Sequence, residues 1–428
     1  MARHAKYVED VATAMSIKFN NYGNAMKAAG EDVTICSFGE AYFDIPLYPF
    51  DTLPFPELYH YSDSRGIIGL RQKLAAYYDT QYGVPVDPAS EIIVTAGSKI
   101  AVHMAFMTLL EPGDEVVVPE PAWVSYSEQV RLCHGNPIMV PRDVPLAELG
   151  NWVTPRTRAL VICSPHNPTG KVFSRDEIRQ LHQVAREHGL YLIADEAYSD
   201  FVAEEPFVSC GVDDPEKEHT IICNTMSKNY GMSGWRIGYV ISNATFMTQF
   251  LKISQHLMTC PATMLEQYLE RHFDDILKIT KPQIRDLVQR RAALGRYMDE
   301  IGLRYMPGTG TFYHFVSIED SRLGSEEFCM RLLSERKVVA VPGVGYGKSC
   351  DGFVRVGMGT ESMDRTKAAL RAVKELIEAT RRPGAEAEGA LPVTRAAMRE
   401  IRGLTVAPVR PEAEETEADE ALAAAAGG

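Results

Sequence analysis

The chain has 428 residues, of which 45% are hydrophobic and 24% are charged, and its formal net charge is −13. This length is enough for two or three domains with sizeable cores, and the composition is that of a globular protein. The negative charge argues against nucleic acid or an anionic membrane surface as the main partner.

The predicted location is the cytoplasm. The N-terminus lacks the apolar core of a signal peptide, and no apolar run is long enough to span a membrane. The eight cysteines are scattered, and none forms a Cys-x-x-Cys pair or a zinc-like spacing with histidine. We therefore expect reduced thiols, which suit the cytoplasm, and no metal site.

In chain order, residues 8–30 are predicted to be helical and to lead into a short strand at 33–38. Loops rich in proline and aromatic residues continue to Tyr61, and a helix follows over 67–82. From about residue 90, β-branched runs alternate with amphipathic stretches such as 176–188. The runs lie at 92–95, 115–118, 160–163, 190–194, 220–223 and 238–241. This alternation predicts an α/β domain with a largely parallel sheet covered by helices on both faces.

The last third of the chain predicts a second, smaller α+β domain. A long charged helix is expected over 281–301, and shorter strands of antiparallel character follow. These strands lie at 310–316, 338–341 and 352–356, before a last helix at 362–381. The resulting domains are an N-terminal segment packing with the small domain (1–44), a large domain (45–284), a small domain (285–381) and a tail (382–428). Residues 411–428 of this tail are Glu- and Ala-rich and contain too few large apolar residues to fold, so we expect a disordered tail, with a short helix near 393–403 as the alternative.

The segment from Thr225 to Tyr239 carries the most specific chemistry. It places Lys228 after an apolar strand and beside Ser227, with a glycine-rich turn and then Arg236. The lysine amine can condense with an aldehyde, and the hydroxyls and the arginine can hold a phosphate. An aldehyde plus a phosphate describes pyridoxal 5′-phosphate, which proteins carry as a lysine Schiff base. Burial beside cations would lower the pKa of Lys228 and free its amine for attack and for later use as a base.

The same segment closely resembles the cofactor-lysine signature of class I/II aminotransferases, which are aspartate aminotransferase-like enzymes of the type I pyridoxal-phosphate fold. The resemblance covers about residues 30–375, and its motifs occur in the family's order. It implies a large domain with a mostly parallel sheet between helices and a smaller α+β domain. It also implies a homodimer with shared active sites, working in amino-acid metabolism and biosynthesis.

The phosphate needs an anion site. Gly97, Ser98 and Lys99 join a strand to a predicted helix, and a helix N-terminus offers free amides to a phosphate. An ordinary helix cap is the alternative for this turn. The resemblance adds Tyr61, in a Tyr-x-x-x-x-Gly element, as a residue that reaches the phosphate from the neighbouring subunit.

Asp195 closes an apolar strand at its carboxyl end, where ligand groups gather in open α/β sheets. A carboxylate there would keep the pyridine nitrogen protonated, and Tyr198, three residues later, would donate a hydrogen bond to the ring oxygen. A helix N-cap is the alternative for a strand-terminal aspartate. The resemblance gives Asn167, in Asn-Pro-x-Gly, a bond to the same ring oxygen and a place near the substrate. It also matches Trp123 to the residue that stacks on the ring, although a lone tryptophan is more often a core residue.

Arg355 alternates with apolar residues on a strand of the predicted small domain. An inward-facing arginine needs an anionic partner, and bidentate pairing with a substrate carboxylate would satisfy it. The resemblance supports this role and matches Gly39 to a backbone contact with the substrate. The catalytic residues are thus predicted to be Lys228, Asp195 and Tyr198.

The predicted reaction moves an amino group between an L-α-amino acid and a 2-oxo acid. Three departures from the family's pattern leave the amino donor open: Ala41-Tyr42 in place of Pro-Asp, Gly357 in place of Ser or Asn, and Ala122 in place of an aromatic residue. The alternative keeps the cofactor but changes the reaction to β- or γ-elimination, replacement, cyclisation or an oxidase-type step. A non-catalytic regulator on this fold, which would carry a DNA-binding module before the enzyme-like part, is disfavoured, because only about thirty residues precede the resemblance and the chain is acidic.

Overall fold

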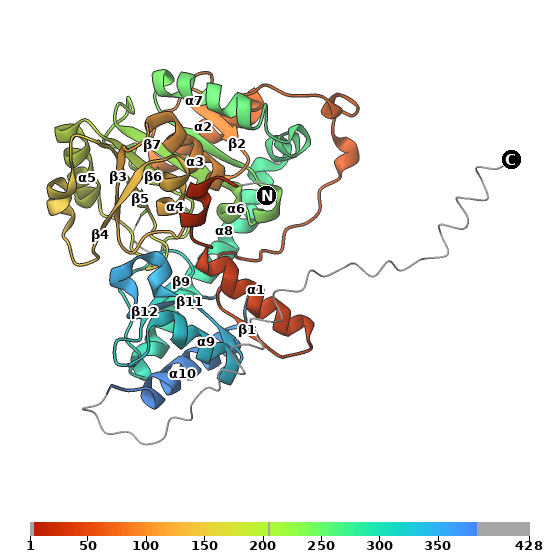
Figure 1. The fold of residues 1–428 in the computed structure, drawn as a ribbon. Coiled ribbons are helices and arrows are strands. Elements are labelled where there is room, and N and C mark those ends of the chain that lie inside the picture. Colours follow the sequence, from red (N-terminus) through yellow and green to blue (C-terminus); the bar gives the residue numbers. More distant parts are fainter. Residues whose placement is uncertain (1–3, 204–205, 383–428) are drawn as a thin grey trace.

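A computed structural model describes residues 4–203 and 206–382 of the chain. The chain forms two lobes, a larger one built on a seven-stranded sheet and a smaller one built on a three-stranded sheet (Figure 1). This confirms the predicted α/β fold with a second α+β unit. The tail predicted to be disordered lies outside the described residues, except for Arg382.

The large sheet has the order β2-β8-β7-β6-β5-β3-β4. Its strands are β2 (Ile92–Thr95), β3 (Glu115–Pro119), β4 (Asn136–Val140), β5 (Thr157–Cys163), β6 (Tyr191–Asp195), β7 (Thr220–Thr225) and β8 (Gly238–Ile241). Neighbouring strands are parallel except where β8 pairs with β2 and with β7. All six predicted strands are present. The sequence analysis missed β4, because this edge strand is only partly buried and contains Pro137, and a proline argues against a strand when a sequence is interpreted.

Helices cover both faces of this sheet, so its central strands are buried along their whole length. They are α2 (Ile68–Tyr82), α3 (Ser98–Leu109), α4 (Tyr126–Leu132), α5 (Arg175–His188), α6 (Met226–Asn229) and α7 (Ala244–Leu257). Helix α5 shows how the local sequence sets these bounds. Ser174 accepts the N–H of Glu177 while the Glu177 carboxylate accepts the N–H of Ser174, and Gly189 ends the helix in the left-handed region.

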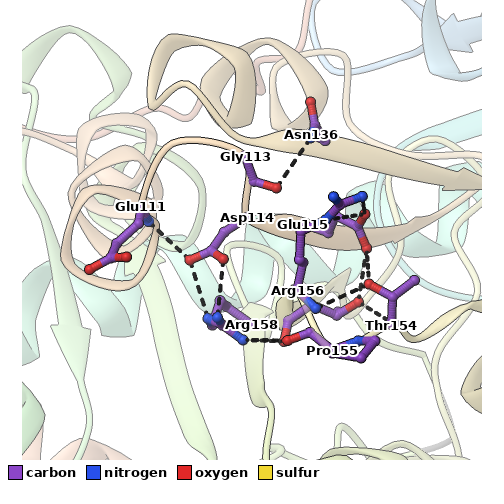
Figure 2. Close-up of polar contacts among 10 residues, drawn as sticks. Glu111, Gly113, Asp114, Glu115, Asn136, Thr154, Pro155, Arg156 and Arg158 are labelled. Atoms are coloured by element: carbon purple, nitrogen blue, oxygen red, sulfur yellow. Dashed lines mark hydrogen bonds and ion pairs between the residues drawn. The ribbon is translucent and has the colours of Figure 1, made fainter.

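Acidic and arginine side chains tie β3 to β5 at their amino ends (Figure 2). The Asp114 carboxylate binds Arg158, and the Glu115 carboxylate binds Arg156 and accepts the Thr154 hydroxyl. Both carboxylates are nearly buried, so these contacts are better shielded than ordinary surface pairs. They lie where the β3–β5 register shifts, between Glu115 and Val116. The cluster fixes the sheet at the edge opposite the carboxyl ends of the strands.

The smaller lobe contains the antiparallel strands β11 (Val341–Pro342), β12 (Phe353–Gly357) and β9 (Tyr313–Ser317), in that order. Helices α9 (Ser325–Arg336) and α10 (Met363–Ala379) pack on it. The predicted strand at 338–341 is divided, because Val338–Val339 (β10) leaves this sheet and pairs in parallel with β1 (Thr34–Ile35).

The N-terminal segment packs against the small lobe through α1 (Met15–Ala28), whose Phe19, Tyr22 and Met26 enter its core. The prediction of one helix over 8–30 was wrong at its start. Residues Lys6–Asp10 form a separate 3₁₀ turn, and the helix begins only at Met15. The strand predicted at 33–38 is also shorter, because only Thr34 and Ile35 find a partner strand.

Helix α8 (Thr263–Glu300) links the two lobes, and the predicted start near 281 was wrong. The helix begins at Thr263 and contains Pro282 in its interior. The N-terminal part is held by packing, since Tyr268 and Phe273 lie in the large lobe's core. From Ile284 onward the helix packs into the small lobe's core. The domain boundaries at residues 44, 284 and 381 stay a prediction.

Residues 42–61, which we call the arm, connect the small lobe to α2 along the outside of the large lobe (orange-red in Figure 1), and Leu53 and Leu58 enter that lobe's core. Two short 3₁₀ turns, Phe50–Thr52 and Glu57–Tyr59, lie in it. Other 3₁₀ turns are Leu146–Trp152, Ser233–Trp235, Gly343–Tyr346 and Lys348–Cys350. None of the helices in the described ranges has the length and apolar character needed to cross a membrane.

Candidate active site

A cavity of about 220 Å³ lies at the carboxyl ends of β5, β6 and β7, which end at Cys163, Asp195 and Thr225. Ten residues that the sequence singled out line this cavity: Gly39, Ser98, Lys99, Trp123, Asn167, Asp195, Tyr198, Ser227, Lys228 and Arg236. They come from the N-terminal segment, five different strand ends or loops and two helices. Carboxyl ends of parallel strands meet at one sheet edge, and therefore residues far apart in sequence gather there.

Lys228 lies in the single turn of α6, which begins where the Thr225 hydroxyl accepts the N–H of Ser227. Its amine donates to the carbonyl of Gly39 in the N-terminal segment. Burial lowers the pKa of Lys228 to about 8; the nearby Glu40 carboxylate opposes this, and the Arg355 charge adds to it. The neutral amine is therefore accessible near neutral pH, as the sequence predicted.

The Asp195 carboxylate is buried at the end of β6 and faces the cavity. It accepts the Tyr126 hydroxyl at 2.8 Å and the Ala197 N–H at 3.3 Å. Burial raises the pKa of Asp195 to about 6, and these two donors counteract it. A cationic N–H donor on the cavity side would stabilise the charged form of this carboxylate, because it would offset the cost of removing the charge from water.

Tyr198 and Asn167 approach the cavity together. The hydroxyl of Tyr198 lies 2.9 Å from that of Tyr313, and the Asn167 amide donates to the same Tyr198 oxygen at 3.5 Å. Burial raises the pKa of Tyr198, so its hydroxyl stays protonated and can donate a hydrogen bond. A ligand oxygen near Asn167 and Tyr198 would meet one amide and one hydroxyl donor.

The anion site is formed by α3 and Arg236. The helix begins at Ser98 after Gly97, which has φ = +90°. A Cβ on Gly97 would lie 2.3 Å from Nη2 of Arg236, so only glycine lets the arginine reach the first turn of α3. The other terminal nitrogen of Arg236, Nη1, donates to the Ser233 carbonyl at 2.6 Å and to the Ser227 hydroxyl at 3.3 Å. The predicted phosphate residues thus converge on one end of the cavity.

Arg355 lies on β12 and is only 3% exposed. It donates to the Asn167 side-chain oxygen at 3.1 Å and to the Ser37 carbonyl at 2.7 Å, and its guanidinium covers the Tyr313 ring at 4.3 Å. Its Nε has no partner, and no carboxylate of the described residues forms an ion pair with it. A buried cation held by neutral groups alone is under-satisfied, and a ligand carboxylate would satisfy it.

These features fit the predicted cofactor. Pyridoxal phosphate needs an amine, an anion site and a carboxylate for its pyridine nitrogen. Lys228, the Gly97–Arg236 pocket and the buried Asp195 meet these needs within one cavity. The orphaned Nε of Arg355 adds a place for a substrate carboxylate beside it.

Two predicted residues are placed less directly. Trp123 lines the cavity with Lys99 over its ring at 5.2 Å and with Tyr126 edge-on at 5.2 Å, so its predicted stacking on the cofactor stays a prediction. Tyr61 is 86% exposed at the end of the arm and is not part of the cavity lining of its own chain.

Sequence reasoning missed three residues of this site. Tyr126 holds Asp195, Tyr313 lies between Tyr198 and Arg355, and Glu40 accepts the hydroxyl of Ser233. Tyr126 follows Trp123 by one helical turn, and this spacing was the only local signal. Tyr313 and Glu40 come from the small lobe and the N-terminal segment, so only the fold brings them to the cavity.

Comparisons with known proteins agree with this geometry. The family described as aminotransferase class I and II matches residues 50–373. An aspartate aminotransferase of Pyrococcus abyssi is 34% identical over 367 residues, covering 81% of this chain and 94% of the relative. An aromatic-amino-acid aminotransferase of Thermococcus litoralis is 32% identical, covering 80% and 93%. The Thermus thermophilus aspartate aminotransferase structure with maleate superposes with a TM-score of 0.78 at 29% identity, covering 88% of this chain and all of the other.

Proposed function

The chain belongs to the class I and II aminotransferases, and from this premise we propose that Lys228, Asp195 and Arg355 are the principal residues of its active site. The protein is a pyridoxal-phosphate-dependent enzyme that transfers an amino group between an L-α-amino acid and a 2-oxo acid. The observation that carries the residue assignment is the cavity that combines a lysine of lowered pKa with a buried carboxylate, beside a buried arginine with an orphaned N–H.

The cofactor, when bound, supplies an aldehyde that condenses with amines and a ring that withdraws electrons from the substrate's α-carbon. We assign its phosphate to Arg236, Ser227 and the first turn of α3, with Ser98 and Lys99. Asp195 would face the ring nitrogen and hold a proton on it, and Tyr126 fixes the orientation of that carboxylate. Asn167 and Tyr198 would donate to the ring oxygen, and Trp123 would pack on the ring face.

Lys228 would move the proton. Its amine is already partly neutral near pH 8, so it can carry the cofactor and, once released, take a proton from the substrate's α-carbon. The Gly39 carbonyl holds this amine toward the N-terminal segment, where a substrate would lie. Arg355 would bind the substrate's α-carboxylate and so orient the α-carbon toward Lys228.

We also propose a homodimer in which the arm covers a second copy. Its side chains Tyr42, Leu47, Phe55, Tyr59 and Tyr61 are exposed, three of them by more than 70%. Apolar surface gathered on one segment marks an interface. Tyr61 would then reach the phosphate of the partner's cofactor. The eight cysteines, all in the described residues and all unpaired, support a reducing compartment such as the cytoplasm.

A half-reaction tests the assignment of function. The purified enzyme, mixed with an amino acid and no oxo acid, should release one equivalent of 2-oxo acid and leave the cofactor in its aminated form. Release of ammonia together with a keto product, over many turnovers, would instead identify an elimination enzyme. A panel of acidic, aliphatic and aromatic amino acids would identify the donor at the same time.

A further inference from the structure

A buried carboxylate of α8 accepts hydrogen bonds from the loop that follows Tyr61. The Ser62 hydroxyl donates to Oε2 of Glu266 at 3.2 Å, and the N–H of Ile67 donates to Oε1 at 3.1 Å. Glu266 is fully buried, although it comes from a helix some two hundred residues away in sequence. One side chain therefore connects both ends of the loop over 62–67.

A buried arginine holds the middle of the same loop. Arg71, which is 4% exposed, donates from Nε to the Gly66 carbonyl at 3.0 Å and pairs through Nη2 with Asp63 at 3.1 Å. Gly66 has φ = +89°, and a Cβ there would lie 2.5 Å from Oε1 of Glu266 and 2.6 Å from Cβ of Val94. The loop thus fits against Glu266 and β2 without space for a side chain.

Burying Glu266 and Arg71 costs free energy, and no contact of Tyr61 with the described residues of its own chain accounts for holding this loop so rigidly. Burying a carboxylate and a guanidinium costs free energy that hydrogen bonds only partly return. The burial of Glu266 raises its pKa to about 7, although the N–H of Ile67 and the Ser62 hydroxyl counteract this. The residue at the end of the loop, Tyr61, is exposed and gains nothing within its own chain from being held rigidly.

We propose that Glu266, together with Arg71, is a positioning residue: by holding the loop over 62–67 it sets the direction in which Tyr61 enters the cavity of a second copy. The inference rests on the proposed dimer with shared sites. Glu266 does not touch the cofactor. It fixes the loop in the isolated chain, so that little conformational entropy is lost when Tyr61 binds across the interface.

Mixed dimers provide the test. Above about pH 8, where Glu266 is ionised, the Glu266→Gln homodimer should bind pyridoxal phosphate about tenfold more weakly, the size expected for losing the ionic hydrogen bonds of one side chain. A mixed dimer of one Glu266→Gln chain and one Lys228→Ala chain, purified through two affinity tags, has a single Lys228. That lysine faces the intact Tyr61 loop of the other chain, so the visible absorbance of cofactor bound to it should titrate with the wild-type dissociation constant.

Failure of this rescue would overturn the inference, because Glu266 would then act within its own chain. Glu270→Gln, one turn away on α8, is the matched control and should leave cofactor affinity unchanged in the homodimer. Ser62→Ala removes a single bond to Glu266 and should give a smaller loss that the same mixed dimer also rescues; it serves if Glu266→Gln does not fold. Tyr61→Phe separates the two proposals. If the Tyr61→Phe homodimer binds the cofactor as tightly as the wild type, the shared site itself is overturned. If that homodimer loses affinity but the mixed dimer does not rescue Glu266→Gln, only the role of Glu266 is overturned.

Discussion

The cavity and the arm are organised in opposite ways. In and beside the cavity, Lys228, Asp195 and Arg355 are held by contacts from their own chain before any ligand binds. The arm is anchored in the large lobe's core by Leu53 and Leu58, while five of its large apolar side chains are exposed: Tyr42, Leu47, Phe55, Tyr59 and Tyr61. The first region is preorganised for chemistry, and the second presents exposed apolar surface that would contact a second chain in the proposed dimer.

The difference suggests a division of work. The groups that would transfer protons and bind the substrate's carboxylate come from one chain, so their geometry does not depend on association. In the proposed dimer cofactor affinity would depend on association, because Tyr61 would reach the phosphate of the partner's cofactor. Each change below tests one side of this contrast, in order of expected size.

Lys228→Ala should have the largest effect. The activity should fall by at least about 10⁴-fold, because both the attachment point and the proton-transferring base are lost. The visible absorption of the purified protein should disappear with it. Lys252→Ala, on the surface of α7, is the control and should keep both. A Lys228→Ala protein that keeps the band would show that another lysine carries the cofactor.

Arg355→Ala should come next. The value of kcat/KM for amino acids should fall by about 10² to 10³-fold, since a buried charge-assisted pair with the substrate carboxylate is lost. Cofactor affinity should change little, because Arg355 contacts Asn167 and Ser37 rather than the phosphate residues. Steady-state kinetics and a cofactor titration measure the two separately. Equal losses in both would contradict the substrate role.

Leu47→Asp tests the arm. Leu47 is 80% exposed, so the folded monomer should tolerate the change, whereas an interface would lose at least about tenfold in its association constant. Sedimentation velocity across a dilution series measures this. Leu132→Asp, an exposed site on α4, is the control. A dimer of unchanged strength would mean that the arm does not form the interface.

The pH dependence should be the smallest effect. The pKa of Lys228 is lowered to about 8, and only the neutral amine attacks, so cofactor uptake by cofactor-free enzyme should accelerate as the pH rises through this value. From pH 7 to pH 9 the neutral fraction rises from about one tenth to about nine tenths, a roughly tenfold gain. Stopped-flow absorbance gives the midpoint. A midpoint near the ordinary lysine value above 10 would show that burial does not act on this amine.

Local patterns were enough to predict much of the site. Ser227, Lys228 and Arg236 share one short segment, and Asp195 and Tyr198 share another, so their spacing alone predicted a common ligand. Strand ends were readable because apolar runs stop abruptly at them. Errors arose where packing outweighed local signals, as at the start of α8, which lies at Thr263 rather than near 281, and at the partly buried edge strand β4.

The sequence by itself determined the chemical groups and their order, because hydrophobic periodicity and short motifs act between near neighbours. The tertiary structure alone decided which distant groups meet: Tyr126 with Asp195, 69 residues apart, Arg355 with Asn167, 188 apart, and Glu266 with Ser62, 204 apart. Such pairings depend on how two lobes and a linking helix pack, and no spacing along the chain encodes that directly. The size of the pKa shift of Lys228 was also decided by the tertiary structure, because the burial that lowers this pKa is a property of the fold.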